Sequence, residues 1–144
     1  MITIAELTKS TKEALNAINH LLPQLSVNAK GLCMDRLAEL VESDNTLIFL
    51  GTDENGCILG MLSLIVMKIP TGNKAWIEDV VVDQSARGKG LGKSLMNHAL
   101  EQAKKLGAKS VDLTSRPSRE SANKLYQALG YEIRETNVYR YNFS

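Results

Sequence analysis

A glycine-rich segment between a strand-like run and a helix-like run most limits what this chain can fold into. The segment reads Arg87-Gly88-Lys89-Gly90-Leu91-Gly92-Lys93-Ser94. Glycines allow a positive φ and a close backbone approach, so successive N–H groups can point into one concavity. A helix that follows adds its free N–H groups and the positive end of its dipole. The segment therefore predicts a cradle for a phosphate or pyrophosphate, with Arg87, Lys89 and Lys93 supplying positive charge.

The spacing of the glycines argues against two common nucleotide motifs. The P-loop pattern G-x4-G-K-[ST] fits Gly92-Lys93-Ser94 at its end, but position 87 holds an arginine where the first glycine is needed. The dinucleotide pattern G-x-G-x-x-G would start at Gly88 and need a glycine at position 93, which is Lys93. Each motif fails by one residue.

Length and composition predict one soluble domain covering residues 1–144. The chain has 44% apolar residues, and its 17 basic and 16 acidic side chains leave a net charge of +1. This near-neutral balance argues against a nucleic-acid binder, which normally carries a basic surplus. Residues 58–69 form the longest apolar run, too short to span a membrane. Without a signal-peptide pattern, and with Cys33 and Cys57 expected to be buried thiols, a cytoplasmic protein is predicted.

The pattern of apolar residues and turn signals predicts a mixed α/β fold with one sheet. We expect a first helix that is capped by Ser10-Thr11, runs through about Leu22 and ends at Pro23. Further helices are expected after Gly31 and at residues 91–106 and 117–129. We expect strands at residues 2–4, 46–52, 57–69, 75–82, 111–114, 131–134 and 138–143. His20 and His98 are expected to be surface or packing residues.

The spacing that does fit the glycine segment is Arg87-x-x-Gly90-x-Gly92. With it the chain resembles the GNAT superfamily of N-acetyltransferases, whose acetyl-CoA pyrophosphate loop reads [QR]-x-x-G-x-[GA]. Residues 77–83 (IEDVVVD) resemble that family's fourth strand, and residues 121–131 (SANKLYQALGY) resemble its final helix motif. Gln84 departs from the proline of many members. The resemblance implies a mostly antiparallel sheet, splayed around acetyl-CoA and flanked by helices.

The resemblance also implies which residues hold the cofactor. The backbone of Val80, Val81 and Val82 would pair with the pantetheine arm at a bulge in the strand. The pyrophosphate would be held, mostly by main-chain N–H groups, by Arg87, Gly88, Lys89, Gly90, Leu91, Gly92 and Lys93. The Asn123 amide would bond the pantetheine or only a neighbouring loop. No metal site is expected.

Acetyl transfer to an amine needs a base, because an amine with a pKa of about 10 is almost wholly protonated at neutral pH. Glu78 is the first candidate and Asp79 its rival. In a regular strand the two side chains point to opposite faces, so only one can face the cleft, and either can simply form a salt bridge. The resemblance makes Tyr126 the acid that protonates the leaving thiolate; the alternative is a packed core tyrosine.

Three functions remain open at this stage. The first is an N-acetyltransferase for a small primary amine, such as an amino sugar, amino acid or polyamine. The second acetylates a protein N-terminus or lysine, and the third is a CoA-binding module without catalysis. Arg116 and Arg119 could clamp an acidic acceptor group, reach the cofactor's 3′-phosphate or face solvent. A homodimer is compatible with the family resemblance.

Overall fold

The computed structural model describes residues 1–143, and the chain divides into two compact units, Met1–Leu113 and the part that begins at Thr114. The first unit holds the sheet and three helices. Its elements follow one another along the chain as β1 (Thr3–Glu6), α1 (Lys12–Leu25), α2 (Met34–Glu42), β2 (Thr46–Thr52), β3 (Ile58–Ile69), β4 (Gly72–Val82), the 3-10 turn η1 (Gln84–Ala86), α3 (Leu91–Lys105) and β5 (Val111–Asp112). The second unit holds α4 (Glu120–Ala128).

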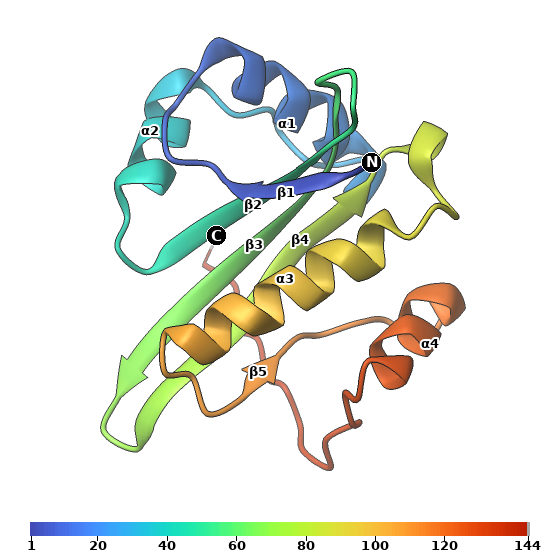
Figure 1. Ribbon diagram of the computed structural model, residues 1–144. Coiled ribbons are helices and arrows are strands. Elements are labelled where there is room, and N and C mark those ends of the chain that lie inside the picture. Colours follow the sequence, from blue (N-terminus) through green and yellow to red (C-terminus); the bar gives the residue numbers. More distant parts are fainter. Residues whose placement is uncertain (144) are drawn as a thin grey trace. The chain divides into compact units, whose positions relative to one another are not determined.

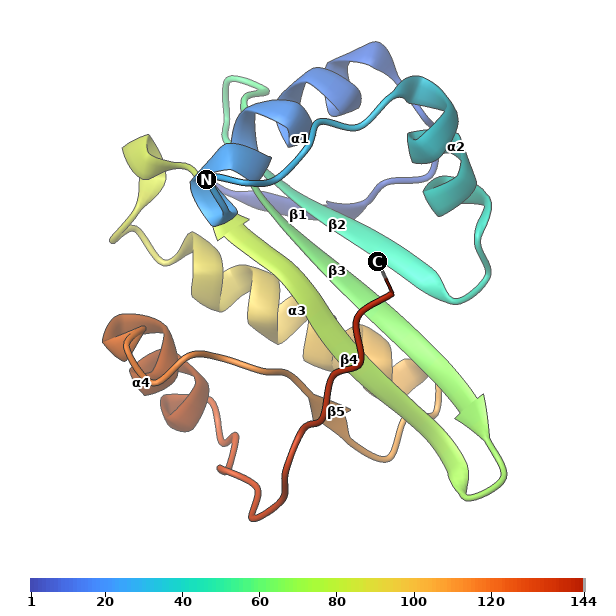
Figure 2. The ribbon, with the colours of Figure 1, turned by 180° about the vertical axis from the view of Figure 1, so that it is seen from behind.

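The sheet has the order β1-β2-β3-β4-β5. Successive strands are antiparallel except for β5, which pairs with β4 in the parallel sense. Helices α1 and α2 cover one face of the sheet and α3 covers the other (Figures 1 and 2). The expectation of a mixed, mostly antiparallel sheet flanked by helices is confirmed.

Strand alternation divides the core of the first unit between the two faces. Along β2, Ile48 and Leu50 join the cluster formed with α1 and α2, which also contains Ile18, Leu21 and Leu37. Between them Phe49 is fully buried and points the other way, with its ring 4.8 Å from that of His98 on α3. Packing on both faces follows from the two-residue period of a strand.

The predicted end of α1 at Pro23 is wrong, because the helix continues to Leu25. Its start is as expected, since the Thr11 hydroxyl accepts a bond from the Ala14 N–H. A proline this close to the C-terminal end removes only one helical hydrogen bond. Leu22 and Leu25 pack against the core, and the Ser26 N–H bonds the Leu22 carbonyl, so the last turn is retained.

Two further expectations are wrong. Residues 131–134 and 138–143 form no strands, although their apolar residues alternate; Ile133, Val138, Tyr139, Tyr141 and Phe143 are 70–93% exposed. Alternation predicts a strand only where another strand pairs with it. The two cysteines are exposed rather than buried, because each lies at the end of an element. Cys33 is the N-cap of α2, and Cys57 follows the β2–β3 turn.

A pair of glycines lets α3 approach the sheet closely. Gly51 of β2 and Gly60 of β3 lie opposite each other, and the Leu91 side chain of α3 fills the space above them. A Cβ at position 51 would lie 2.5 Å from Leu91 Cδ1, and one at position 60 would lie 3.0 Å from Leu91 Cδ2. The first turn of α3, which follows the glycine segment directly, is therefore seated by this contact.

We expect Gly51→Ala to lower the free energy of unfolding by about 1–3 kcal/mol, because the added methyl overpacks the buried Leu91 side chain. Urea denaturation measures the change. In a Leu91→Ala background the same substitution should cost much less, since the space is then open. An equal cost in both backgrounds would show that the Leu91 contact is irrelevant.

Candidate active site

The site is built along one continuous stretch: β4, η1, the glycine loop (residues 87–90) and the first turn of α3, which Figure 1 shows following one another. The residues on which the sequence analysis placed a base and a pyrophosphate cradle all lie within this stretch, in the first unit.

A β-bulge interrupts β4 at the predicted pantetheine position. On β3, Met61 pairs with Val81 and Ser63 pairs with Glu78, so Leu62 alone faces the two residues Asp79 and Val80. Asp79 has φ 52°, the only positive value for a non-glycine residue among residues 1–143. An extra residue in one strand with an irregular backbone is what defines a bulge.

The bulge changes which face of the sheet the side chains of β4 occupy. Ile77 pairs with Leu64 and is buried on the α3 side, whereas Val81, four residues later, is buried in the α1–α2 cluster. A regular strand would put both on one face. Glu78 pairs with Ser63, so it lies on the same face as Val81. Unlike Val81, it is not covered by α1 and α2 and is exposed.

Glu78 and Asp79 are both exposed. Because the bulge begins at Asp79, the rule that neighbouring side chains of a regular strand point to opposite faces does not apply to this pair. Within the described part of the chain neither carboxylate forms an ion pair. Two adjacent exposed carboxylates can attract a cationic amine and accept a proton from it.

The outer edge of β4 is open next to the bulge. Its pairing with β5 covers only Ala75 and Trp76, opposite Val111 and Asp112. From Ile77 to Val82, no strand among residues 1–143 pairs with this edge. An extended ligand with amide groups can hydrogen-bond to such an edge as an added strand does.

The glycine loop has the backbone conformation that the sequence predicts. Gly88 and Gly90 have φ 80° and 83°, and a Cβ at either position would meet no atom within 4 Å. Gly90 is the N-cap of α3, and no side chain caps the helix there. The start of α3 therefore keeps N–H groups that no side chain caps, next to open space at Gly88 and Gly90, which suits the binding of an anion.

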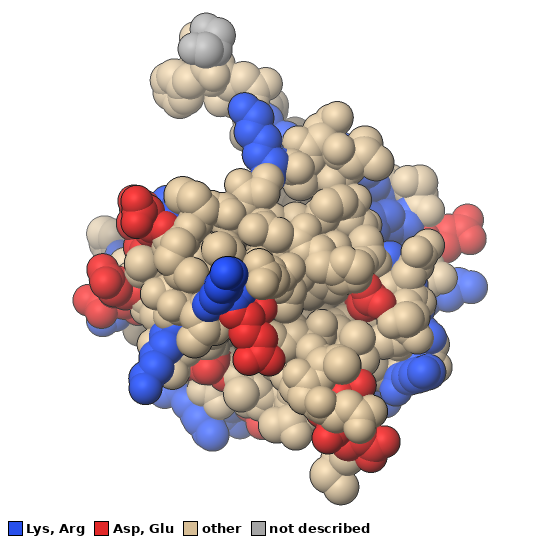
Figure 3. All heavy atoms as spheres, turned by 90° about the horizontal axis from the view of Figure 1, so that it is seen from above, with Lys and Arg blue, Asp and Glu red and all other residues tan. Residues whose placement is uncertain are grey.

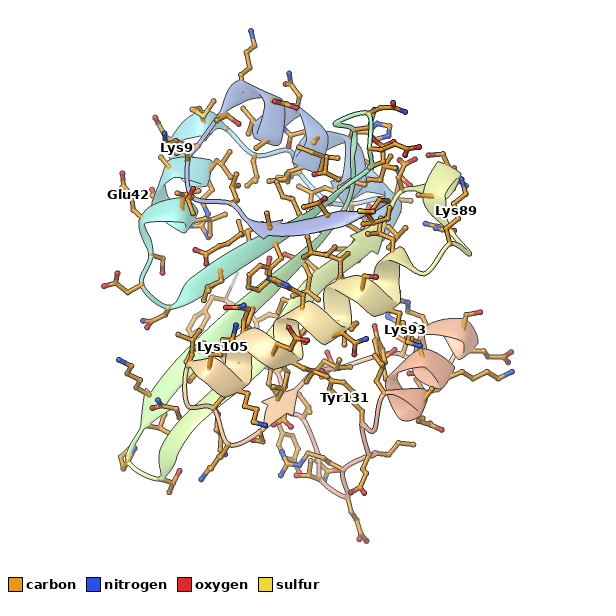
Figure 4. All side chains as sticks on the ribbon, viewed as in Figure 1. Lys9, Glu42, Lys89, Lys93, Lys105 and Tyr131 are labelled. Atoms are coloured by element: carbon orange, nitrogen blue, oxygen red, sulfur yellow. The ribbon has the colours of Figure 1, made fainter. Side chains whose placement is uncertain are left out.

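Three cationic side chains surround the loop. Lys89 lies on the loop and Lys93 on the first turn of α3, and both are exposed (Figure 4). The Arg87 Nε–H donates to the Val82 carbonyl at 3.3 Å, which bends the loop back toward the end of β4. Elsewhere the charges are mixed; the face in Figure 3 carries acidic and basic side chains interspersed.

Asp83 anchors the entrance to the loop. Its side chain is only 11% exposed, and Oδ1 accepts bonds from Gln24 Nε2 at 2.8 Å and from His20 Nε2 at 2.8 Å. Oδ2 accepts bonds from the backbone N–H of Ser85 at 3.1 Å and from the Ser85 hydroxyl. These bonds, that of Gln24 first, hold the pKa of Asp83 well below its usual range, against the opposing effect of burial.

The lowered pKa of Asp83 predicts an acid-dependent contribution to stability. The unfolded carboxyl takes up a proton near pH 4, whereas the folded one stays ionised to lower pH. The stabilisation is therefore complete above about pH 5 and falls as the pH drops below about 4. In urea titrations, we expect the amount by which the unfolding free energy of the wild type exceeds that of Asp83→Asn to shrink as the pH falls from about 5 to below 4. A gap independent of pH would contradict this assignment.

Sequence reasoning missed this anchor. His98 is half-buried and packs on Phe49, as expected, but His20 is exposed and bonded to Asp83. His20 and Gln24 lie 63 and 59 residues from Asp83 along the chain, so no local pattern signals their meeting.

The second unit holds the other predicted residues. Tyr126 on α4 is 8% exposed, with its ring centroid 6.0 Å from that of Tyr131. Asn123, one turn earlier, donates from Nδ2 to the Arg116 carbonyl at 2.9 Å, the loop contact that the sequence analysis left open. Arg116 and Arg119 are exposed.

No group of three His, Cys, Asp or Glu side chains among residues 1–143 is placed to hold a metal ion. In the same part of the chain, no helix has the length and apolar character needed to cross a membrane.

Comparison with known proteins gives consistent matches. The family described as "Acetyltransferase (GNAT) family" matches residues 15–131. The uncharacterized N-acetyltransferase YhdJ of Bacillus subtilis is 28% identical over 144 residues, covering 97% of this chain and 98% of that protein. The glucosamine 6-phosphate N-acetyltransferase of Trypanosoma brucei brucei is 40% identical over 86 residues, which are 58% of this chain and 56% of that enzyme.

A solved structure supports the same relationship at the level of the whole fold. The crystal structure of a Trypanosoma brucei acetyltransferase superposes with a TM-score of 0.80 at 27% identity, covering 99% of this chain and 100% of that one. This chain thus has the glycine loop and the bulged strand, and it is similar to these relatives along nearly its full sequence.

Proposed function

Since this chain belongs to the acetyltransferase (GNAT) family and is an acetyl-CoA-dependent N-acetyltransferase, we propose that it acetylates the primary amine of a small molecule. The observation that carries the proposal is the bulge in β4, which leaves Glu78 and Asp79 exposed beside an open strand edge. The glycine loop follows the same strand, so donor and base would meet at one place.

The cofactor would be held by main-chain groups. The open edge at Val80, Val81 and Val82 fits the amides of pantetheine, and the uncapped start of α3 fits the pyrophosphate. Gly88 and Gly90 leave the approach clear, because a Cβ there would meet nothing and the ligand can come close. Arg87, Lys89 and Lys93 would balance the phosphate charge, with Leu91 and Gly92 offering helix N–H groups.

The transfer would be direct attack. Glu78, or Asp79 in its place, takes a proton from the ammonium group, directly or through a water molecule. The free amine nitrogen attacks the thioester carbonyl carbon, a C–N bond forms, and the C–S bond breaks. Tyr126 gives its phenolic proton to the departing thiolate. The nitrogen of the new amide loses its remaining extra proton to the Tyr126 phenolate through water, and the proton held by the carboxylate leaves to solvent. Asn123 helps to hold the pantetheine arm.

An amino sugar is the first acceptor to test. The matching part of the Trypanosoma brucei brucei relative belongs to a glucosamine 6-phosphate N-acetyltransferase, and two exposed carboxylates suit a cationic amine. Arg116 and Arg119 are available for a phosphate or carboxylate on the acceptor or for the cofactor's 3′-phosphate.

The test is thiol release from acetyl-CoA by the purified protein with a panel of amines. The panel contains glucosamine 6-phosphate, glucosamine, spermidine, free amino acids and a lysine-containing peptide. Release that depends on one small amine would support the proposal. Release with the peptide alone would replace it by protein acetylation, and binding of acetyl-CoA without release for any amine would favour a binding module.

We further propose that two chains associate through residues 131–143. Five large apolar side chains are exposed there, and three aromatic side chains alone bury about 450–750 Å² when covered. A stable interface needs about 800 Å² per partner. Light scattering should give twice the chain mass, and Tyr141→Ser with Phe143→Ser should halve it; a monomeric wild type would exclude this.

A further inference from the structure

The end of α1 is hydrogen-bonded to the chain segment that leads into the glycine loop. Gln24, in the last turn of α1, uses both ends of its side-chain amide. Its Nε2 donates to Asp83 Oδ1 at 2.8 Å, and its Oε1 accepts from the Gln84 N–H at 2.9 Å. One side chain thus holds two successive residues at the point where β4 ends and η1 begins.

After η1 and the Arg87–Val82 bond, the glycine loop has few contacts that fix its shape. Gly88 and Gly90 are in the left-handed region, and a Cβ at either would find nothing within 4 Å. Glycine also has more conformational freedom than other residues in the absence of packing. The order of the loop must therefore come from its two ends, which are the start of α3 and the anchored segment around Asp83.

The start of α3 is fixed by Leu91, which is 1% exposed and packed over Gly51 and Gly60. The other end depends on the bonds to Asp83. Of the two side chains that reach Asp83 from α1, His20 is 68% exposed, so solvent weakens its hydrogen bond to Asp83. Gln24 is the only one of the two that also holds the backbone of residue 84.

We infer that Gln24 is a positioning residue for cofactor binding, which keeps the glycine loop in the shape that accepts the pyrophosphate of acetyl-CoA. This inference rests on the proposed cofactor site. In this role Gln24 acts through Asp83 and Gln84: it raises the fraction of molecules whose loop is competent to bind. The apparent dissociation constant for acetyl-CoA is inversely proportional to that fraction, so it rises when the fraction falls.

The test replaces Gln24 by methionine, which keeps the length of the side chain and removes both hydrogen bonds. Calorimetric titration should show a dissociation constant for acetyl-CoA raised about tenfold, a size expected from two lost hydrogen bonds. The kcat at saturating acetyl-CoA should stay within about twofold of wild type. With S-acetylpantetheine, which lacks the pyrophosphate, the two proteins should show the same kcat/KM.

The matched control is Asp53→Asn. Asp53 orders the β2–β3 turn by accepting bonds from the N–H groups of Asn55 and Cys57, both at 2.9 Å. It should lose stability without losing affinity for acetyl-CoA. Asp83→Asn changes the acceptor of the Gln24–Asp83 hydrogen bond and should weaken acetyl-CoA binding as Gln24→Met does. It provides a second test of the inference if Gln24→Met folds poorly.

The outcomes separate this inference from the proposed function. Acetyl-CoA binding by Gln24→Met equal to that of wild type would overturn the role of Gln24 and leave the enzyme function intact. An equal loss with S-acetylpantetheine would also overturn it, because the effect would then not concern the pyrophosphate. A wild type that does not bind acetyl-CoA at all would instead reject the proposed cofactor site.

Discussion

Replacing Tyr126 by phenylalanine is expected to lower turnover about 10²-fold while leaving the affinity for acetyl-CoA unchanged. The substitution removes only the hydroxyl. Tyr126 is 8% exposed and its ring centroid lies 6.0 Å from that of Tyr131, and phenylalanine keeps this packing. A loss of rate with an intact fold therefore reports on the proton that the departing thiolate needs.

The measurement is steady-state thiol release with the acceptor found in the panel, together with calorimetric binding of acetyl-CoA. Tyr131→Phe is the matched control, because it removes a hydroxyl from the neighbouring ring of the same unit. Its turnover should remain near that of wild type. Full activity in Tyr126→Phe would remove this residue from the mechanism, and a similar loss in both variants would point to a structural cause.

The parts of the site that could be predicted from the sequence are those that depend on neighbours along the chain. The positive φ of Gly88 and Gly90 and the start of α3 at Leu91 follow from local glycine spacing. The cap at Thr11 and the turn closed by Asp53 are equally local. In each case a side chain or glycine acts within four residues of itself.

The parts that could not be derived depend on distant pairing. The bulge at Asp79 arises because two residues of β4 face one of β3, which is a property of strand register and not of either strand alone. A bulge at this place was expected only because of the family resemblance. The Gln24–Asp83 contact needs α1 to be packed against the sheet before it exists. The strands expected in residues 131–143 are absent, because an alternating pattern forms a strand only when another strand pairs with it.

The two candidate bases occupy different backbone positions at the bulge, so they can be distinguished by substitution. Glu78 is paired with Ser63 in the ladder, whereas Asp79 is the bulged residue at φ 52°. Asparagine tolerates this backbone conformation, so Asp79→Asn removes a charge without adding strain. Glu78→Gln removes a charge at a regular, exposed strand position. The two variants are therefore matched in size of change and differ in which carboxylate is lost.

We expect Glu78→Gln to lower kcat by about 10²–10³-fold at neutral pH, because the ammonium group then has no base to take its proton. The deficit should shrink as the pH approaches the pKa of the acceptor amine, about 10 for a simple alkyl amine and lower for an amino sugar, because the amine then loses its proton to solvent unaided. Asp79→Asn should stay within about threefold of wild type across the same range. Rates measured from pH 6 to 10 check both expectations. A large loss of kcat in Asp79→Asn alone would make Asp79 the base. A loss of kcat in Glu78→Gln that does not shrink with rising pH would mean that Glu78 does not act by removing this proton.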